Sequence, residues 1–239
     1  MISYNSNFRT LIVKLCLTAV AFACVSCRTH KDGFTPEELA LINGTDSILR
    51  VLTIDDAEDY AVLRTPSADL SAEALLSADY ERLAQLMVAT VTDPSQDGVG
   101  IAGPQVGLNR RIVAVQRFDK GIKGPDGSET YPFEVYPNIR IVWASDSLCT
   151  GEEGCLSVPG QRGQVTRSKE IVIEYTSLNS TGTSDGIRKG RLRQKAGLPV
   201  VRDTVRGFTA IIFQHETDHL DGILYIDKLK TGKEEQKSE

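Results

Sequence analysis

Two histidines and the glutamate that follows the first of them are the residues of this sequence best suited to chemistry. His215 and His219 are four positions apart in the stretch 214–220. Residues i and i+4 lie on one face of an α-helix, because each turn takes 3.6 residues. Both rings could therefore bind one metal ion, with Glu216 beside that ion to handle protons rather than to ligate.

The residues before this stretch favour a metal site over two polar side chains on a solvated helix face. An apolar stripe on the same side of the expected helix runs directly into the histidines. Its members are Phe208, Ile211 and Ile212. Asp203 or Thr204 can cap this helix, and Gly222 can end it.

A metal site needs further ligands, and their position separates classes of enzyme. Tyr225 stands where a metzincin has its third histidine, although Gly222 matches the glycine of that motif. An acidic ligand on a later helix has little room, because little sequence follows His219. A third ligand is therefore expected upstream, where the non-carboxylate candidates after the first thirty residues are Cys149 and Cys155.

Two glycine-rich stretches could approach such a site. The stretch 98–107 contains four glycines, which let a backbone come close to a ligand, and Gln105 offers an amide donor there. A dinucleotide-binding loop is excluded, because no strand precedes the stretch and Pro104 interrupts the following helix. In the stretch 151–160, Cys155 stands between a glycine and a leucine. A lone cysteine is more often a buried apolar residue, but the histidine pair favours a ligand.

The remaining elements follow from periodicity. Ser71 or Ser77 can cap a helix that reaches about Thr92. The residues at helical spacing there are predicted to be core residues without a cofactor role: Leu76, Tyr80, Leu83 and Met87. Short strands are expected at 111–115, 133–135, 139–143 and 171–175, with a turn at 121–128.

Composition describes an ordinary globular protein. A chain of 239 residues suits one catalytic domain with additional segments. The hydrophobic share of 41% and the charged share of 25% are typical of globular proteins. The net charge of -5 gives no electrostatic reason to expect nucleic acid as a partner.

The first 27 residues have the features of a secretion signal. Arg9 and Lys14 make a positive start, and the apolar run 15–25 is too short to span a bilayer but suits a signal-peptide core. Small residues then lead to cysteine, as in bacterial lipoproteins. Cys27 is the favoured lipidation site and Cys24 the alternative. A buried amphipathic helix is disfavoured by the length of the apolar run.

Three stretches together resemble the peptide deformylase family. That family's patterns are G-x-G-[LI]-A-A-x-Q, E-G-C-L-S and Q-H-E-x-D-H-L, and the matching residues here are 98–105, 153–157 and 214–220. The resemblance covers roughly 48–229 and implies an α+β fold, with antiparallel sheets packed around a central metal-binding HExxH helix. Four segments are therefore expected: a signal at 1–27, a polar tether at 28–47, a catalytic domain at 48–230 and a charged tail at 231–239.

The resemblance also assigns roles. It implies that Cys155, His215 and His219 bind a divalent metal, Fe(II) in the family with zinc or nickel as substitutes, and that Glu216 is the general acid/base. The oxyanion donors would be two groups, the side chain of Gln105 and the backbone N–H of Leu156. The pocket for a methionine-like side chain would be lined by Val99, Gly100, Ile101, Phe208, Ile211 and Ile212.

Some positions add detail to this resemblance or depart from it. Arg167 matches an arginine that can pair with the glutamate at Glu153. Gly103 replaces the second alanine of the first motif, a small change that could loosen the loop. The basic stretch 187–195 resembles an insertion within a polar loop or hairpin. None of these changes falls on an expected ligand.

The implied reaction is removal of the formyl group from N-formylmethionyl peptides. A metallopeptidase or amidohydrolase acting on other exported peptides is one alternative. The metallopeptidase is disfavoured because Tyr225 stands where a metzincin has its third histidine. A catalytically silent surface-binding homologue is the other, disfavoured by the intact Glu216.

The N-terminal signal predicts an exported monomer anchored to a bacterial membrane through its lipid, and a cytoplasmic housekeeping enzyme is the alternative. Cleavage at Cys27 would leave Cys149 and Cys155 as the unmodified thiols, which are expected to be able to pair in an oxidising compartment.

Overall fold

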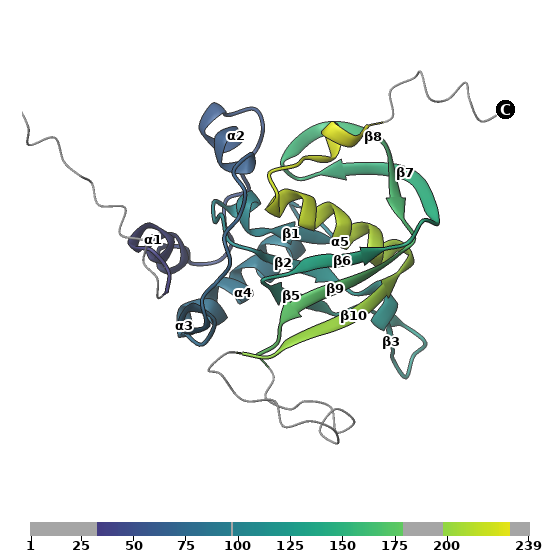
Figure 1. Ribbon diagram of the computed structural model, residues 1–239. Coiled ribbons are helices and arrows are strands. Elements are labelled where there is room, and N and C mark those ends of the chain that lie inside the picture. The colour runs from purple at the N-terminus through teal and green to yellow at the C-terminus, as the bar shows by residue number, and fades with distance from the viewer. Residues whose placement is uncertain (1–32, 97, 179–197, 230–239) are drawn as a thin grey trace, which may run out of the picture. The chain divides into compact units, whose positions relative to one another are not determined.

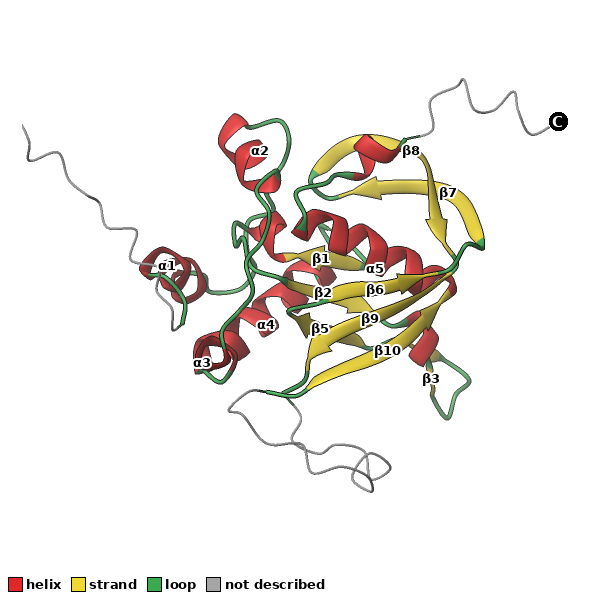
Figure 2. Ribbon diagram, in the orientation of Figure 1, coloured by secondary structure: helices red, strands yellow, loops and turns green. Residues whose placement is uncertain are grey.

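Helices form the first part of the chain and strands form most of the remainder in the computed structural model (Figure 1 and Figure 2). The structure describes residues 33–96, 98–178 and 198–229. The helices before the first strand are α1 (Pro36–Gly44), α2 (Ala57–Leu63), α3 (Ala72–Leu75) and α4 (Ala78–Thr92). Among them, α4 packs against strands of the first sheet.

The region expected to be a polar tether contains α1, so that expectation is wrong for its second half. Thr35 and Glu38 form a reciprocal capping box at the helix N-terminus. Phe34 and Ile42 bury their side chains in the core beside α4. The polar composition of the segment concealed these two anchors. The compact unit therefore begins ahead of α1 and not at residue 48.

Both serines proposed as caps act as caps, each for its own helix. Ser71 caps α3 and Ser77 caps α4. Tyr80, Leu83 and Met87 are buried along α4 as predicted. Leu76 is 70% exposed, contrary to the prediction, because it ends α3 and does not belong to the buried face of α4.

The four predicted strands lie in two three-stranded sheets, each of which is completed by a strand that was not predicted, β1 or β10. The first sheet has the order β1-β2-β5, with β1 Gly100–Ala102, β2 Ile112–Gln116 and β5 Phe133–Pro137. The second has the order β10-β9-β6, with β6 Arg140–Ala144, β9 Glu170–Thr176 and β10 Val200–Arg206. A small hairpin occupies the expected turn between β2 and β5, with β3 Ile122–Lys123 and β4 Glu129–Thr130.

Two long strands that periodicity did not predict form a separate pair. They are β7 (Leu148–Cys155) and β8 (Val158–Ser168), which carry glycines at 151, 154, 160 and 163 and lack regular apolar alternation. Every pairing between named strands of the described residues is antiparallel. The predicted α+β class with antiparallel sheets is therefore confirmed.

The histidines lie on α5 (Gly207–Leu220), which packs against strands of both sheets and against β8 (Figure 2). Its N-cap is Arg206, and not Asp203 or Thr204, because β10 stays paired with β9 as far as Arg206. Gly222 has a φ of 73° just beyond the helix, as expected of a residue that ends it.

Short 3₁₀ segments connect these elements. They are η1 (Gly103–Val106), η2 (Phe118–Lys120) and η3 (Tyr225–Lys228). The core residues of α5 pack with the second sheet and with β2; they are Ala210, Ile212, Phe213 and Leu220. Ala210, Phe213 and Leu220 fix one side of α5 in the core, which leaves the other side, with Ile212 at its edge, to carry the histidines.

Three of the predicted segments lie outside the described residues. They are the signal at 1–27, the basic stretch at 187–195 and the tail at 231–239. Among the helices in the described ranges, none combines the length and the apolar character needed to cross a bilayer.

Candidate metal centre

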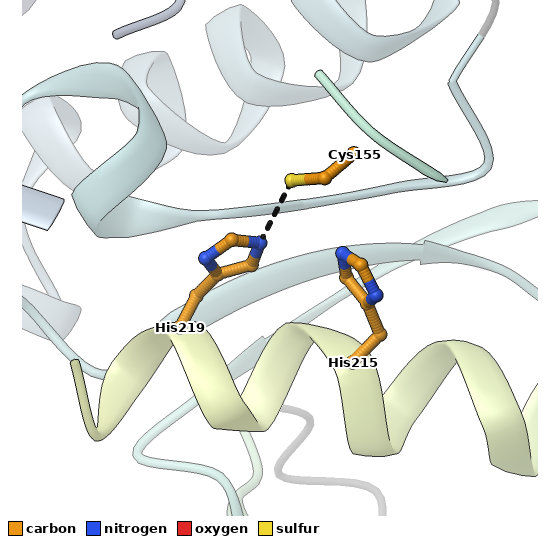
Figure 3. A group of neighbouring side chains, drawn as sticks. All are labelled: Cys155, His215 and His219. Atoms are coloured by element: carbon orange, nitrogen blue, oxygen red, sulfur yellow. Dashed lines mark hydrogen bonds between the residues drawn. The ribbon is translucent and has the colours of Figure 1, made fainter. Parts of the chain in front are cut away.

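Three potential ligands converge between α5 and the end of β7. His215 and His219 project from one face of α5, and their ring centroids are 5.1 Å apart (Figure 3). Cys155 faces them from the last position of β7, with Sγ 3.3 Å from His219 Nε2. The potential ligand atoms of the three residues all lie within 4.8 Å of one another. One ion could contact all three.

The structure brings Cys155, and not Cys149, to the histidines. Both cysteines belong to β7, where Cys149 pairs with Arg167 and Cys155 with Val158. Six residues of extended strand span ~20 Å at ~3.3 Å per residue. A disulfide requires Cα atoms about 4.4–6.8 Å apart. The expected pairing of Cys149 with Cys155 is therefore wrong for the folded chain, in which both are free.

A buried ion-pair network fixes the ring of His215. His215 Nδ1 lies 2.9 Å from Glu153 Oε2. Glu153 also accepts two hydrogen bonds of 2.8 Å from Arg167, as the resemblance implied. Burial alone would raise the pKa of Glu153, but hydrogen bonds from Arg167 and His215 hold that pKa at about 2. The carboxylate therefore accepts from Nδ1–H, which leaves Nε2 of His215 free to ligate.

Two buried polar atoms of α5 have no hydrogen-bond partner among the described residues. They are Nδ1 of His219 and Oε2 of Glu216. Burial lowers the pKa of His219, so its imidazole is neutral, which is the ligand form. Burial raises the pKa of Glu216 to about 7. One cysteine sulfur and two imidazole nitrogens form a donor set suited to a divalent transition metal with an open position.

The glycine-rich loop lies directly against Glu216. A Cβ added to Gly100 would stand 2.5 Å from Glu216 Oε1. Only a glycine lets the β1 backbone come this close to the carboxylate. The loop and the helix are thus in contact at the residue expected to move protons.

Gln105 reaches the same place from η1. Its Nε2 lies 3.5 Å from Cys155 Sγ and 3.3 Å from Ser157 Oγ. Its Oε1 accepts a hydrogen bond of 2.8 Å from the Ala102 backbone, which directs the NH₂ group towards the cysteine. Gln105 is 1% exposed, so its amide is desolvated.

A cavity of about 790 Å³ opens in front of these groups. Its walls include most of the residues expected to line a pocket: Val99, Gly100, Phe208, Ile211 and Ile212. They also include Gln105, Cys155, Leu156, His215 and Glu216. Ile101 is fully buried in the core beside α4, so its expected place in the pocket is wrong. Side chains alternate along β1, and the neighbouring Gly100 faces the cavity instead.

Gly103 tightens its turn and does not loosen the loop. A Cβ at this buried position would stand 2.6 Å from the carbonyl oxygens of both Leu108 and Arg110. The glycine therefore lets the following turn pack directly on η1.

Sequence reasoning missed four contacts of the site. Asp218 binds Arg167 from α5, and Lys228 binds Asp218 in turn. Tyr225 stacks on His215 with a centroid distance of 6.0 Å. Glu153 and Cys155 are two positions apart, and such residues share a face of a strand. Had β7 been predicted, Glu153 would therefore have been expected close to His215. Tyr225 gave no such signal.

Comparison with known proteins agrees with this geometry. A family model described as polypeptide deformylase matches residues 48–185 and 195–235. The chain is 33% identical over 172 residues to the peptide deformylase of Leptospira biflexa serovar Patoc, covering 72% of this chain and 84% of that protein. It is 37% identical over 160 residues to peptide deformylase 2 of Nostoc sp., covering 67% of this chain and 77% of that protein.

Solved structures give the same result. The Met-Ala-Ser-bound class I type b peptide deformylase from Acinetobacter baumannii has 34% sequence identity and a TM-score of 0.59, covering 77% of this chain and all of that one. The peptide deformylase from Thermotoga maritima has 25% identity and a TM-score of 0.58. The resemblance inferred from the three motifs is confirmed: the chain belongs to the peptide deformylase family of enzymes.

Proposed function

We propose that this chain removes the formyl group of N-formylmethionyl peptides at a divalent metal ion held by Cys155, His215 and His219. The observation that carries the proposal is the convergence of these three ligands within 4.8 Å, beside the unpartnered Glu216 Oε2. The HExxH segment of α5 supplies two of the ligands. We propose Fe(II) as the native ion, with zinc or nickel as substitutes, because thiolate and imidazole donors suit all three.

The ion, when bound, supplies a Lewis acid that lowers the pKa of a water molecule. Glu216 accepts the proton of the attacking water while the water oxygen forms its bond to the formyl carbon. The Gln105 amide and the Leu156 backbone N–H donate to the developing oxyanion. The C–N bond then breaks, Glu216 returns its proton to the departing amine, and formate is released.

The cavity supports selectivity for formylated methionine. Val99, Ile211 and Ile212 provide an apolar wall, and the exposed ring of Phe208 extends it at the rim. A formyl carbon carries only hydrogen, so we expect the space beside Cys155 to admit a formyl group and to reject the larger acetyl group. Steady-state hydrolysis of formyl-Met and acetyl-Met peptides tests this, and the formyl peptide alone should be cleaved. Internal cleavage of an unformylated peptide without deformylation would instead support a metallopeptidase.

We propose that the mature protein begins at lipidated Cys27 and acts as a membrane-anchored, exported monomer. The sequence features at 1–27 support this location. Because α1 is docked on the core, a tether would end before Phe34. Mass spectrometry of the native membrane fraction tests the location. A cytosolic product that retains residues before Cys24 would restore the cytoplasmic alternative.

A further inference from the structure

A helix that precedes the residues matched by the family model is fixed to the loop that carries Gln105. This helix, α1, packs beside α4 (Figure 1). It ends before residue 48, where the match to the family model begins. Glu38 of α1 accepts two hydrogen bonds from Arg110, from Nε at 2.6 Å and from Nη2 at 3.0 Å. The Arg110 and Glu38 side chains are only 16% and 15% exposed, so solvent screens this bidentate pair less than a surface pair.

Arg110 closes the turn that packs on the Gln105 segment. Its carbonyl oxygen would lie 2.6 Å from a Cβ on Gly103, the first residue of η1. Its backbone N–H donates to the Leu108 carbonyl at 2.6 Å. Gln105 is two residues beyond Gly103 in the same short 3₁₀ segment. A shift of the turn would therefore move the Gln105 amide.

Apolar contacts add to this connection. Leu41 of α1 is 3.8 Å from a Cβ on Gly107, the residue that ends η1. Phe34 and Ile42 share a core cluster with Val106. The α1 segment thus holds the Gln105 loop from the side that faces away from the cavity.

We infer that α1 positions Gln105, and that Glu38 and Arg110 are positioning residues for deformylation. This inference rests on the oxyanion role proposed above for Gln105. Oxyanion donors act at about 2.7–3.1 Å, so small displacements matter. The competing explanation is that α1 only adds stability to the fold. The two differ in whether the effect of Glu38 depends on Gln105.

A double-mutant cycle separates these explanations in metal-loaded enzyme. Glu38→Gln keeps an acceptor for the Thr35 N–H but removes the charge that pairs with Arg110. We expect kcat to fall about tenfold with KM unchanged, because the misplaced amide contacts the transition state. In a Gln105→Ala background the same change should lower kcat by less than about twofold, since the group that Glu38 positions is absent.

Two further measurements complete the test. Glu174→Gln breaks an exposed pair with Arg202 between β9 and β10, and this matched control should leave kcat unchanged. Hydrogen–deuterium exchange of residues 103–110 should be faster in Glu38→Gln, while exchange in α5 and the metal content stay as in the wild type.

Equal losses of kcat in both backgrounds, or unchanged exchange at 103–110, would overturn the positioning role. A wild-type enzyme that released no formate from formyl-Met peptides would instead refute the proposed function. The exchange measurement would still decide whether the Glu38–Arg110 pair holds the loop.

Discussion

Arg117 and Arg167 are each buried among two or more carboxylates, and only the Arg167 cluster adjoins the candidate metal centre. Arg117 is 2% exposed in its side chain and binds Asp119, Asp203 and Glu134. It also donates to the hydroxyl of Tyr136. Among the described residues, no buried side-chain atom of this cluster lacks a partner. The cluster is complete in itself, which is what a structural role requires.

Arg167 is equally buried, at 3% exposure, but its cluster ends on a proposed ligand. It holds Glu153, and Glu153 in turn holds the ring of His215. Two unpartnered buried atoms, on Glu216 and His219, lie on the same helix as that ring. The difference teaches that buried charge alone does not indicate function. Here the indication is the combination of unpaired buried polar atoms with a cluster of potential metal ligands.

The largest expected effect comes from the unpaired carboxylate. Glu216→Gln should lower kcat by about a thousandfold, because the amide cannot accept and return a proton. The metal content should stay at the wild-type level, since Glu216 is not a proposed ligand. Formate release and elemental analysis measure the two quantities on one preparation. A variant with more than a tenth of wild-type activity would contradict the role of Glu216.

The second effect compares the two arginines directly. Arg167→Met should weaken metal binding by about 10–100-fold, because Glu153 loses the partner that fixes it on His215. Competition with a chelator measures this affinity.

Arg117→Met is the matched control for that change. It should lower the free energy of unfolding by about 3–5 kcal/mol, because Asp119, Glu134 and Asp203 lose the positive charge that pairs with them. Its folded fraction should bind the metal as tightly as the wild type. Equal metal affinity in the two variants would remove the distinction between the clusters.

The smallest effect concerns the turn behind Gln105. Gly103→Ala should lower the free energy of unfolding by about 1–3 kcal/mol, because the new methyl group meets two carbonyl oxygens. Gly44→Ala is the control, since a Cβ there meets nothing within 4 Å. Urea denaturation compares the two. A Gly103→Ala protein as stable as the control would show that the turn relaxes freely.

The sequence predicted the parts of this molecule whose signals are local. The spacing of His215 and His219 placed both on one helix face, and Ser77 was one of two candidate caps for the helix that is α4. These two features depend on residues within a few positions of one another. Cys155 was one of two candidate thiols, and it was favoured only because the histidine pair needed a further ligand and the family motif contains a cysteine.

The features that were missed depend on contacts between distant segments. Phe34 and Ile42 anchor α1 by contacts with residues far along the chain, and the polar majority of the stretch 28–47 led its four large apolar residues to be assigned to a tether. The β7–β8 pair lacks apolar alternation, so neither the Glu153–His215 contact nor the separation of Cys149 from Cys155 could be anticipated. Tyr225 was noted only because it stands where a metzincin has its third histidine, whereas its ring stacks on the proposed ligand His215.

Metal content of anaerobically purified Cys155→Ser protein, measured beside the wild type, tests the central claim most directly. Serine keeps the size of the side chain but removes the thiolate donor that faces His219. We predict close to one equivalent of divalent metal in the wild type, and loss of nearly all of it in the variant together with deformylation. A Cys155→Ser protein with full metal content and wild-type turnover would contradict the assignment of Cys155, His215 and His219 as the metal site.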